Sequence, residues 1–440
     1  MNKSLLSWGR YPYQPQTAHS VFWRGDIPRV IDRVAGPSFE SSLAYGMGRS
    51  YGDSCLSVSN HVVLMQGMDK IVDADWHNGV LTAEAGLTFD QLIKIILPRG
   101  WFLPVTPGTC FVTLGGAVAN DVHGKNHHSM GTIGRHVKQI LLYRSQEGLV
   151  ECSPQENQDL FAATIGGLGL SGIIVTVKIQ LRQIKTSSIT RIGRRFSCID
   201  EFFALSSEYD KRHEYSVAWI DCLASGKQTG RGRYVVGDHS DRGELHLAPN
   251  SQAGVPITPP FSLVNSISLR LFNSLYYHRQ PVTEVRDSVD YSTFFYPLDS
   301  VLDWNRLYGK RGFQQYQCVI PEKDSREAIR ALLSEIVSSR TGSFLAVLKT
   351  FGALTSPGLL SFPLPGVTLA LDFPQKDGQN AKLFQRLDSI VHEVGGRLYP
   401  AKDAHMSAKH FKKAYPAWER IDAMRDPRLL SRFWRRVTSS

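Results

Sequence analysis

The stretch GTCFVTLGGAVANDVHGKNHHSMGTIGRHV, residues 108–137, packs six glycines and four histidines around one short apolar run. Another glycine-rich turn, AYGMGRSYGDS (44–54), precedes it in the same β-rich region and is the first glycine turn along the chain. Successive backbone N–H groups in such turns form a concave nest that can hold a pyrophosphate without a helix. One such turn is typical of any tight loop, but two in one region favour a site for a phosphate-bearing cofactor.

Three better-known site motifs do not fit this sequence. GLGLSG (167–172) has the glycine spacing of a dinucleotide-binding turn, yet the β-branched run IIVTV follows where a helix should begin. ANDVHGKN (119–126) lacks both the first glycine and the hydroxyl residue of a P-loop. His123, His127 and His128 are flanked by glycines and have no acidic partner at metal-ligand spacing, so we expect no metal.

Length and composition indicate a globular protein of two domains. The chain has 440 residues, of which 42% are hydrophobic and 20% charged, and its six cysteines show no metal spacing. We expect a reduced compartment, no signal peptide and no membrane-spanning segment, because no apolar run is long enough. The net charge of +10 favours an acidic partner. Nucleic acid is not expected, since the basic residues are dispersed and no nucleic-acid motif is present.

The hydrophobic pattern predicts an α+β protein. Strands are expected at 61–66, 79–86 and 172–181, and helices at 88–100, starting at a Thr cap, and at 153–167. A second region has predicted strands at 215–225, 313–321, 343–352 and 366–374, with a helix at 324–340 behind an Asp324 cap. In strand 366–374, Val367, Leu369, Leu371 and Phe373 share one face, and Thr368, Ala370 and Asp372 the other. This order predicts an antiparallel sheet with helices on one face.

The segment 246–280 has two interpretations. It begins rich in Pro and Ser and then becomes rich in apolar residues. It is either a long loop with a packed helix, or a mobile lid or membrane-touching patch.

The glycine turns GMGRSYGD (46–53) and PGT..VT.GGA.A.D.HGKNHH (107–128) resemble those of FAD enzymes of the vanillyl-alcohol-oxidase superfamily, which carry a PCMH-type FAD-binding domain. More closely, the chain resembles the decaprenylphosphoryl-β-D-ribose oxidase family. The likeness spans nearly the whole chain and continues through YSVAWIDC, PLDSVLDWNRLYGKRGFQQYQ, VLKTFG, LDFPQKDG and GRLYPAKDAH. It implies a two-domain α+β flavoprotein, with an FAD-binding domain at 1–186, a central antiparallel-sheet substrate domain at 187–396, and a segment 397–440 that returns to the FAD domain.

The resemblance also implies the cofactor residues. In many superfamily members a His or Cys of the first glycine turn bonds covalently to the flavin; here Arg49 stands in that place, so we expect non-covalent FAD. The residues expected to hold FAD are Tyr45, Gly46, Met47, Gly48, Arg49, Ser50, Tyr51, Gly52, Asp53, Ser54, Gly108, Thr113, Leu114, Gly115, Gly116, Asn120, Asp121, His123, Ile174 and Tyr399.

Oxidation of a secondary alcohol requires hydride transfer from carbon to the flavin and loss of the hydroxyl proton. Lys402 matches the family's essential lysine, and Tyr51 and His123 are expected to flank the reacting sugar. Lys349 suits the phosphate of a lipid-linked sugar, and Trp219 is either a substrate wall or a core residue. The residues expected to contact the substrate are Lys125, Trp219, Gln315, Gln317, Lys349, Thr368 and Ala370.

Two positions depart from the better-studied family members. Thr368 stands where they have Asn, and Ala370 where they have the Cys that nitroaromatic inhibitors trap covalently. Alanine has no thiol to form that adduct, so we expect this chain to be insensitive to the trapping.

The resemblance implies oxidation of the 2′-hydroxyl of a polyprenyl-phosphoryl pentose to a 2′-keto sugar, the first half of an epimerisation in cell-envelope synthesis. An NAD(P)H-dependent keto-reductase partner would complete it. The alternatives are an FAD enzyme for a free sugar, alditol or aldonolactone, and a flavin-binding subunit without chemistry. A lipid-linked sugar phosphate as substrate implies a cytoplasmic protein with peripheral contact at the inner membrane.

Overall fold

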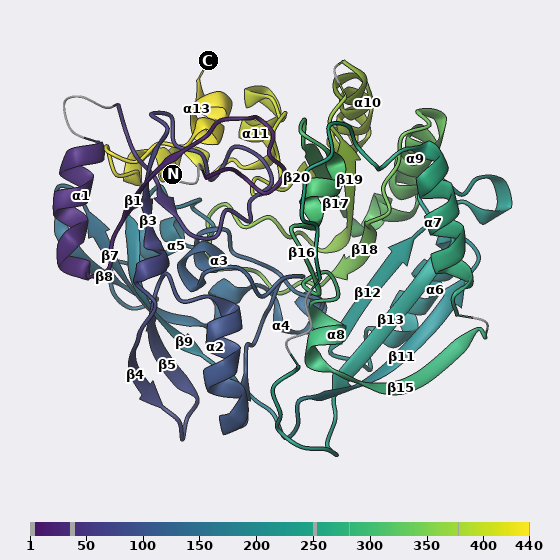
Figure 1. Cartoon of the computed structure of the whole chain (residues 1–440), viewed down its shortest axis with the longest axis horizontal. Coiled ribbons are helices and arrows are strands. Elements are labelled where there is room, and N and C mark those ends of the chain that lie inside the picture. Colours follow the sequence, from purple (N-terminus) through teal and green to yellow (C-terminus); the bar gives the residue numbers. More distant parts are fainter. Residues whose placement is uncertain (1–4, 36–39, 250–252, 281, 377, 440) are drawn as a thin grey trace.

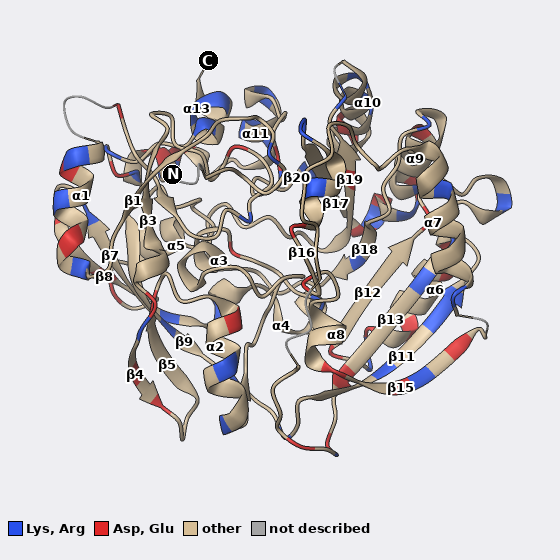
Figure 2. Ribbon diagram, in the orientation of Figure 1, with Lys and Arg blue, Asp and Glu red and all other residues tan. Residues whose placement is uncertain are grey.

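The computed structural model describes residues 5–35, 40–249, 253–280, 282–376 and 378–439. Two sheet systems stand side by side, an N-terminal one and a larger one built from the middle of the chain (Figure 1). The last helices lie over the N-terminal half. Acidic and basic residues are interspersed along the ribbon, most visibly on β11 and β15 (Figure 2). In the described part of the chain, no helix has the length and apolar character that a membrane crossing requires.

The N-terminal half contains a small parallel sheet and a five-stranded antiparallel sheet. The parallel sheet has the order β1–β3–β2, with α1 (Ile27–Val34) packed against it; its strands are β1 (Thr17–Ser20), β2 (Ala44–Tyr45) and β3 (His61–Leu64). The other has the order β4–β5–β9–β7–β8: β4 (Ile71–Asp75), β5 (Val80–Glu84), β7 (Val137–Arg144), β8 (Gly148–Cys152) and β9 (Ile173–Gln180). A strand pair, β6 (Trp101–Phe102) and β10 (Arg182–Gln183), and the helices α2 (Phe89–Ile96), α3 (Leu114–Ala119), α4 (His127–Met130) and α5 (Gln158–Thr164) complete this half.

The second half is built on an eight-stranded antiparallel sheet, as the sequence predicts. Its order is β15–β11–β13–β12–β18–β19–β17–β20: β11 (Ser188–Phe196), β12 (Tyr215–Ile220), β13 (Gly232–His239), β15 (Glu284–Asp290), β17 (Phe313–Pro321), β18 (Ala346–Phe351), β19 (Gly366–Pro374) and β20 (Arg397–Leu398). The helices α6 (Ile199–Tyr209), α9 (Ser325–Ser338) and α10 (Gln379–Glu393) bury apolar side chains in the same core as this sheet. Shorter elements are α8 (Tyr291–Phe295), β14 (Ala253–Gly254) and β16 (Val301–Leu302).

The helices predicted at 88–100, 153–167 and 324–340 are present, but they begin or end at other residues than predicted. α2 begins with a reciprocal cap in which Thr88 Oγ1 accepts from Gln91 N, and its last turn tightens before Gly100, which has a φ of +78°. α5 is shorter than predicted, because the Ser153 side chain accepts from the Gln155 and Glu156 amides and folds that stretch into a turn. Asp324 precedes α9 as expected, but the prediction that it caps the helix is wrong, since its side chain makes no cap hydrogen bond.

Strand β19 confirms the predicted division of its two faces. Val367, Leu369, Leu371 and Phe373 are buried in the core that α9 and α10 cover. The opposite face is not a solvent face, because Thr368 and Ala370 line an internal cavity.

Segment 246–280, of which residues 250–252 lie outside the described residues, contains a packed helix. α7 (Ser266–His278) begins at Asn265, whose side chain accepts from Ile267 N and Ser268 N. The helix buries Leu269 and Tyr277 and exposes a stripe that is described below.

The end of the chain packs on the N-terminal half. The helices after β20 are α11 (Ala408–Ala414), α12 (Trp418–Met424) and α13 (Arg432–Thr438). Single β-bridges join Ser42 to Leu429 and Ser57 to Ser431. The Arg436 guanidinium on α13 bonds the carboxylates of Asp53 and Asp403. The domain boundaries at 186/187 and 396/397 stay a prediction, and residue 397 begins β20 of the large sheet.

Candidate active site

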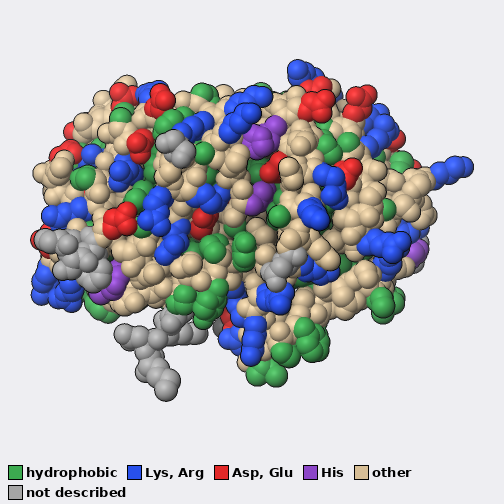
Figure 3. All heavy atoms as spheres, turned by 90° about the horizontal axis from the view of Figure 1, so that it is seen from above, with side chains coloured by type: hydrophobic (Ala, Val, Ile, Leu, Met, Phe, Trp, Pro, Cys, Tyr) green, Lys and Arg blue, Asp and Glu red, His purple; other side chains and the backbone are tan. Residues whose placement is uncertain are grey.

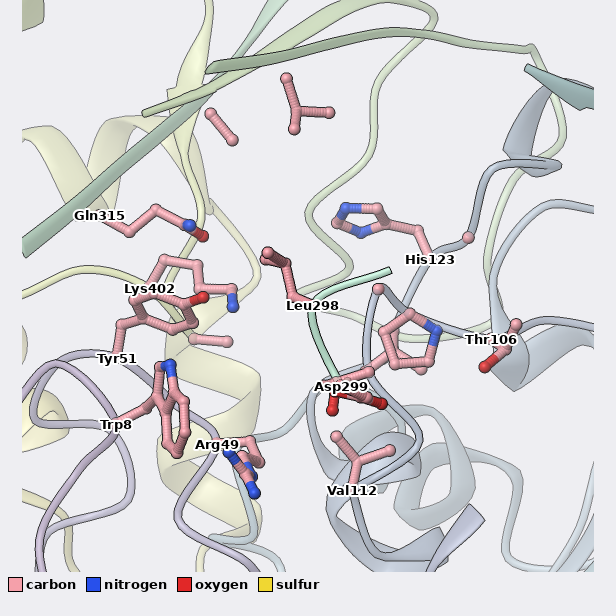
Figure 4. A pocket seen from close by; sticks show the side chains of 18 of the residues that line it. Trp8, Arg49, Tyr51, Thr106, Val112, His123, Leu298, Asp299, Gln315 and Lys402 are labelled. Carbon is pink, nitrogen blue, oxygen red and sulfur yellow. The ribbon is translucent and has the colours of Figure 1, made fainter. Parts of the chain in front are cut away.

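A cavity of about 1060 Å³ lies between the two halves of the molecule. Both predicted glycine turns line one side of it, and the large sheet contributes side chains from β12, β17, β18 and β19 on the other. Figure 4 shows Tyr51, Lys402 and Gln315 close together, with His123 across the cavity. The fold therefore brings together residues that are far apart in sequence, such as Tyr51 and Lys402.

Most of the residues predicted from sequence line this cavity. From the cofactor set these are Tyr45, Gly46, Met47, Gly48, Arg49, Ser50, Tyr51, Ser54, Gly108, Thr113, Gly115, Gly116, Asn120, His123, Ile174 and Tyr399. From the substrate and catalytic sets they are Lys125, Trp219, Gln315, Gln317, Lys349, Thr368, Ala370 and Lys402.

Gly52, Asp53, Leu114 and Asp121 do not line the cavity, and their contacts show how they support it. A Cβ on Gly52 would lie 1.7 Å from the Asp403 carbonyl oxygen, so glycine is required for the first turn to touch the segment that carries Lys402. Leu114 is fully buried in the core, and the Asp121 carboxylate accepts from Gly134 N, Ser356 and Ser361.

The FAD side of the cavity has the features that a bound cofactor requires. A Cβ on Gly108 would meet no atom within 4 Å, and no positive φ demands glycine there, so the missing side chain leaves space in the cavity itself. The buried Nδ1 of His123 and Oγ of Ser54 have no hydrogen-bond partner among the described residues. Buried polar atoms are normally satisfied, so both are suited to bond a ligand. These residues fit FAD.

Lys402 lies against the first glycine turn. Its Nζ is 3.6 Å from the centroid of the Tyr51 ring, and Tyr51 N donates to the carbonyl of Ala401 at 3.0 Å. Burial lowers the pKa of Lys402, while the nearby Asp372 carboxylate raises it. Burial also raises the pKa of Asp372, whose Oδ1 accepts from Gln315 at 2.6 Å. An amine with a lowered pKa next to this carboxyl group can exchange a proton near neutral pH.

His123 is held as a neutral ring. Burial first, and then the charges of Lys349 and other neighbours, lower its pKa well below the ordinary value. Gln317 Nε2 lies 3.2 Å from His123 Nε2 and 3.3 Å from Thr368 Oγ1. If this amide nitrogen donates to Nε2, the ring proton resides on Nδ1, the atom without a partner.

Two further lysines lie on the substrate side. Burial lowers the pKa of Lys349 to about 7 and that of Lys125 to about 8. Their ammonium groups donate to backbone carbonyls, Lys349 to Gly124 at 3.2 Å and Lys125 to Phe295 at 3.0 Å. Among the described residues neither forms a salt bridge with a carboxylate, and the Asp299 carboxylate raises the pKa of Lys125 against the larger effect of burial. Both cations are available to an anionic ligand.

Trp219 and Ala370, two further residues expected to contact the substrate, also line the cavity. Trp219 Nε1 donates to the Phe344 carbonyl at 2.8 Å, and its ring meets Tyr276 of α7 edge to face at 4.7 Å. It is thus both packed and part of the cavity wall. Ala370 is partly open to the cavity between Gln317 and Val347 of the neighbouring strands.

Sequence reasoning missed three residues of this site. Trp8 stacks under the Arg49 guanidinium at 3.9 Å, and Asp299 raises the pKa of Arg49 against the lowering effect of burial. Asp372 neighbours Lys402. The alternation of strand 366–374 already placed Asp372 on the non-core face with Thr368 and Ala370, a signal that could have identified it. Nothing local marked Trp8 or Asp299.

Comparisons with known proteins agree with this site. A family model described as "FAD binding domain" matches residues 40–153. The chain is 34% identical to the decaprenylphosphoryl-β-D-ribose oxidase of Mycolicibacterium smegmatis, over 97% of this chain and 95% of that protein. It is 23% identical to the L-gulono-1,4-lactone dehydrogenase of Mycobacterium tuberculosis, over 95% of both chains, and 25% identical to a putative D-arabinono-1,4-lactone oxidase of Neurospora crassa over 38% and 33%. FAD is the cofactor, and the chain belongs to the decaprenylphosphoryl-β-D-ribose oxidase family of FAD-dependent oxidoreductases.

Proposed function

We propose that this protein oxidises the 2′-hydroxyl of a polyprenyl-phosphoryl pentose to the 2′-keto sugar. The observation that carries the proposal is the pair of partly buried lysines, Lys349 and Lys125, on the substrate side of the cavity that also holds the Lys402 amine. Burying several ammonium groups near one another is unfavourable unless an anion joins them. A sugar phosphate supplies that anion.

The roles of the residues follow from their positions. Bound FAD would accept the hydride from the sugar carbon. Lys402 Nζ would take the hydroxyl proton as the hydride leaves, so that the alcohol loses two electrons and two hydrogens to become the ketone. Tyr51 stays protonated, because burial raises its pKa, and would orient the sugar together with His123. Lys349 and Lys125 would bind the phosphate.

We further propose that α7 guides the lipid and contacts an anionic membrane surface. Phe272 and Tyr276 on α7 line the cavity, while the other face of the helix exposes Ile267, Leu271 and Leu275 to 79%, 62% and 65%. Residues 245–283 contain no Asp or Glu. Seen from above, hydrophobic and basic side chains lie next to one another along one edge of the molecule (Figure 3). An apolar stripe without acidic neighbours suits an interfacial helix.

Liposome co-sedimentation tests this contact. We expect the holoenzyme to bind vesicles with anionic lipid more strongly than zwitterionic ones, and the variant Leu271→Ser/Leu275→Ser to lose binding. The matched control is Leu149→Ser, at an exposed leucine on β8 outside the stripe. Equal binding by both variants and the wild type would remove α7 from the proposal.

The keto product implies a partner. A 2′-ketone is reduced from the opposite face by hydride from NAD(P)H to give the 2′-epimer, so a keto-reductase would consume the product. Non-covalent FAD belongs to the same proposal, because Arg49 cannot form the covalent flavin bond; acid precipitation should release all flavin into the supernatant.

The decisive experiment is anaerobic reduction of the purified flavoprotein. A short-chain polyprenyl-phosphoryl ribose should bleach the flavin absorption, and Lys402→Met should slow bleaching by roughly 100-fold or more while retaining FAD. Bleaching by free sugars but not by the lipid-linked sugar would contradict the proposal.

A second candidate is oxidation of a free aldonolactone, favoured by the end-to-end similarity to the L-gulono-1,4-lactone dehydrogenase. Bleaching by L-gulono-1,4-lactone that is unchanged in Lys349→Met would support it, because a lactone has no phosphate for Lys349.

A further inference from the structure

A group of metal-ligating side chains lies away from the cavity, between α10 and α11. Asp388 and His392 are one turn apart on α10, and His410 lies on α11. One ligand atom from each of the three lies within 4.8 Å of the others. Figure 3 looks down on the side of the molecule where α10 and α11 lie and shows histidine side chains reaching the surface near its middle.

The two histidine rings lie against each other, and one of their nitrogen atoms is left without a hydrogen bond in the described part of the chain. Their rings stack with centroids 3.7 Å apart and planes 30° apart. The Nε2 atom of His392 is buried and has no hydrogen-bond partner among the described residues. Leaving a buried polar atom unpaired costs desolvation free energy, and a ligand bound to this atom would remove that cost.

Asp388 is already oriented as a ligand. Its Oδ1 accepts from the Tyr316 hydroxyl at 3.0 Å, and His405 Nε2 lies 3.3 Å from the carboxylate. Hydrogen bonds of this kind orient metal-binding carboxylates.

We propose that Asp388, His392 and His410 form a zinc site that joins α10 to α11. Two imidazole nitrogens and one carboxylate oxygen match the ligand preference of Zn²⁺, with a fourth position left to water. A zinc tetrahedron with bonds of about 2.0–2.1 Å requires ligand atoms about 3.3 Å apart. The present ligand atoms lie within 4.8 Å of one another, so they must close by up to about 1.5 Å. His410, half-buried at the surface, can supply this movement by side-chain rotation.

The site would act on the segment between the two helices. That segment carries Tyr399 and Lys402, and it is linked to α10 through His405 and Asp388. A zinc ion bound to both His392 and His410 would join the two ends of this segment and so restrict its motion. The predicted role is therefore to position the Lys402 segment, and it does not depend on which alcohol the enzyme oxidises.

The test uses the FAD-loaded enzyme without a histidine tag, stripped by a chelator and titrated with Zn²⁺ against a chromophoric zinc indicator. We expect one tight Zn²⁺ per chain, a rise in Tm, and slower hydrogen exchange in residues 393–411. His410→Ala and His392→Gln should each weaken binding by at least about 100-fold. His278→Ala, at a histidine on α7 outside the cluster, should bind like the wild type.

Retained FAD absorption verifies that each variant is folded. Zinc binding that is absent from the wild type, or that is equal in the wild type and both cluster variants, would overturn the proposal. Neither result depends on the identity of the sugar substrate, so failure here is separate from failure of the proposed oxidation.

Discussion

Lys349 makes substrate affinity dependent on pH. Its buried ammonium group has a pKa of about 7 in the free enzyme, so its charge is present below that pH and is lost as the pH rises through it. Binding of a phosphate-bearing substrate should therefore weaken between pH 6 and pH 8.5. The substrate's own negative charge moves this midpoint upward in the complex, and Lys125, with a pKa of about 8, retains part of the attraction.

Lys349→Met should raise the KM for the lipid-linked sugar roughly 10- to 100-fold at pH 6.5, because a hydrogen bond to a charged group contributes about 1.5–3 kcal/mol. It should also flatten the pH profile of kcat/KM near pH 7. Lys211→Met, at an exposed lysine outside the cavity, is the control. An unchanged KM with a lower kcat would instead assign Lys349 to the chemical step.

We predict that Ala370 makes this protein insensitive to covalent trapping by nitroaromatic inhibitors. It is open to the cavity next to Gln317, in the place where related enzymes carry the trapped cysteine. After turnover with such an inhibitor, intact mass should show no adduct on the wild type and one adduct on Ala370→Cys. A stoichiometric adduct on the wild type would mean that another group is trapped. Cys55 is a thiol that lines the cavity, and burial raises its pKa to about 12.

At the scale of elements, Gly52 controls how closely two segments approach. The Cβ that Gly52→Ala introduces would overlap the Asp403 carbonyl, which belongs to backbone and cannot rotate away. The Lys402 segment must then shift, and a misplacement of about 1 Å can cost roughly 100-fold in rate. We expect a large loss of kcat and a lower Tm, measured by flavin bleaching and thermal unfolding.

Gly25→Ala is the matched control for this change. A Cβ there meets no atom within 4 Å, so activity and Tm should stay at the wild-type values. Full activity in Gly52→Ala would show that the contact between the first glycine turn and the Lys402 segment is dispensable.

At the scale of the molecule, Arg436 joins the last helix to both parts of the active site. Its guanidinium bonds Asp53, which lies in the glycine turn 44–54, and Asp403, which follows Lys402. Both carboxylates are almost fully buried, and the guanidinium lowers the pKa of Asp403 against the opposing effect of burial.

Arg436→Met leaves the buried Asp53 carboxylate without its cation and leaves Asp403 with His405 at 3.2 Å; loss of a buried cation typically costs about 3–5 kcal/mol. We expect a marked loss of stability in denaturant unfolding and weaker FAD retention. The loss should be smaller at low pH, because protonation of Asp53 in the variant removes the uncompensated charge. Arg435→Met, whose partner Glu40 is exposed, should change stability little.

Much of the fold could be predicted because the hydrophobic pattern is strong where one face is buried. Strand 366–374 is the best example, since its alternation identified the core face correctly. Helix ends were less predictable: α5 lost its first turn to the Ser153 side chain, a local hydrogen bond that competes with the helix. α10 and the C-terminal helices were not predicted.

The residues of the candidate site likewise differ in whether the sequence could identify them. The glycine turns and Lys402 were identifiable, because short motifs preserve the chemistry that each position needs. Trp8 and Asp299 owe their place to contacts across long stretches of chain, and no local pattern encodes such contacts. Asp372 differs, because the alternation of strand 366–374 already placed it on the same face as Thr368 and Ala370. His410 is likewise distant from Asp388 and His392, so spacing alone did not indicate a metal site.

By itself, the sequence determined the class of the protein: an α+β flavoprotein with two glycine turns, a lysine in a shared motif, and no cysteine at position 370. These features are local, because each depends only on the backbone conformation and side-chain chemistry of a few neighbouring residues. Only the tertiary structure decided that three lysines meet in one cavity and how burial shifts their pKa values. Desolvation and Coulomb interactions depend on distance in space, and distance in space is set by packing.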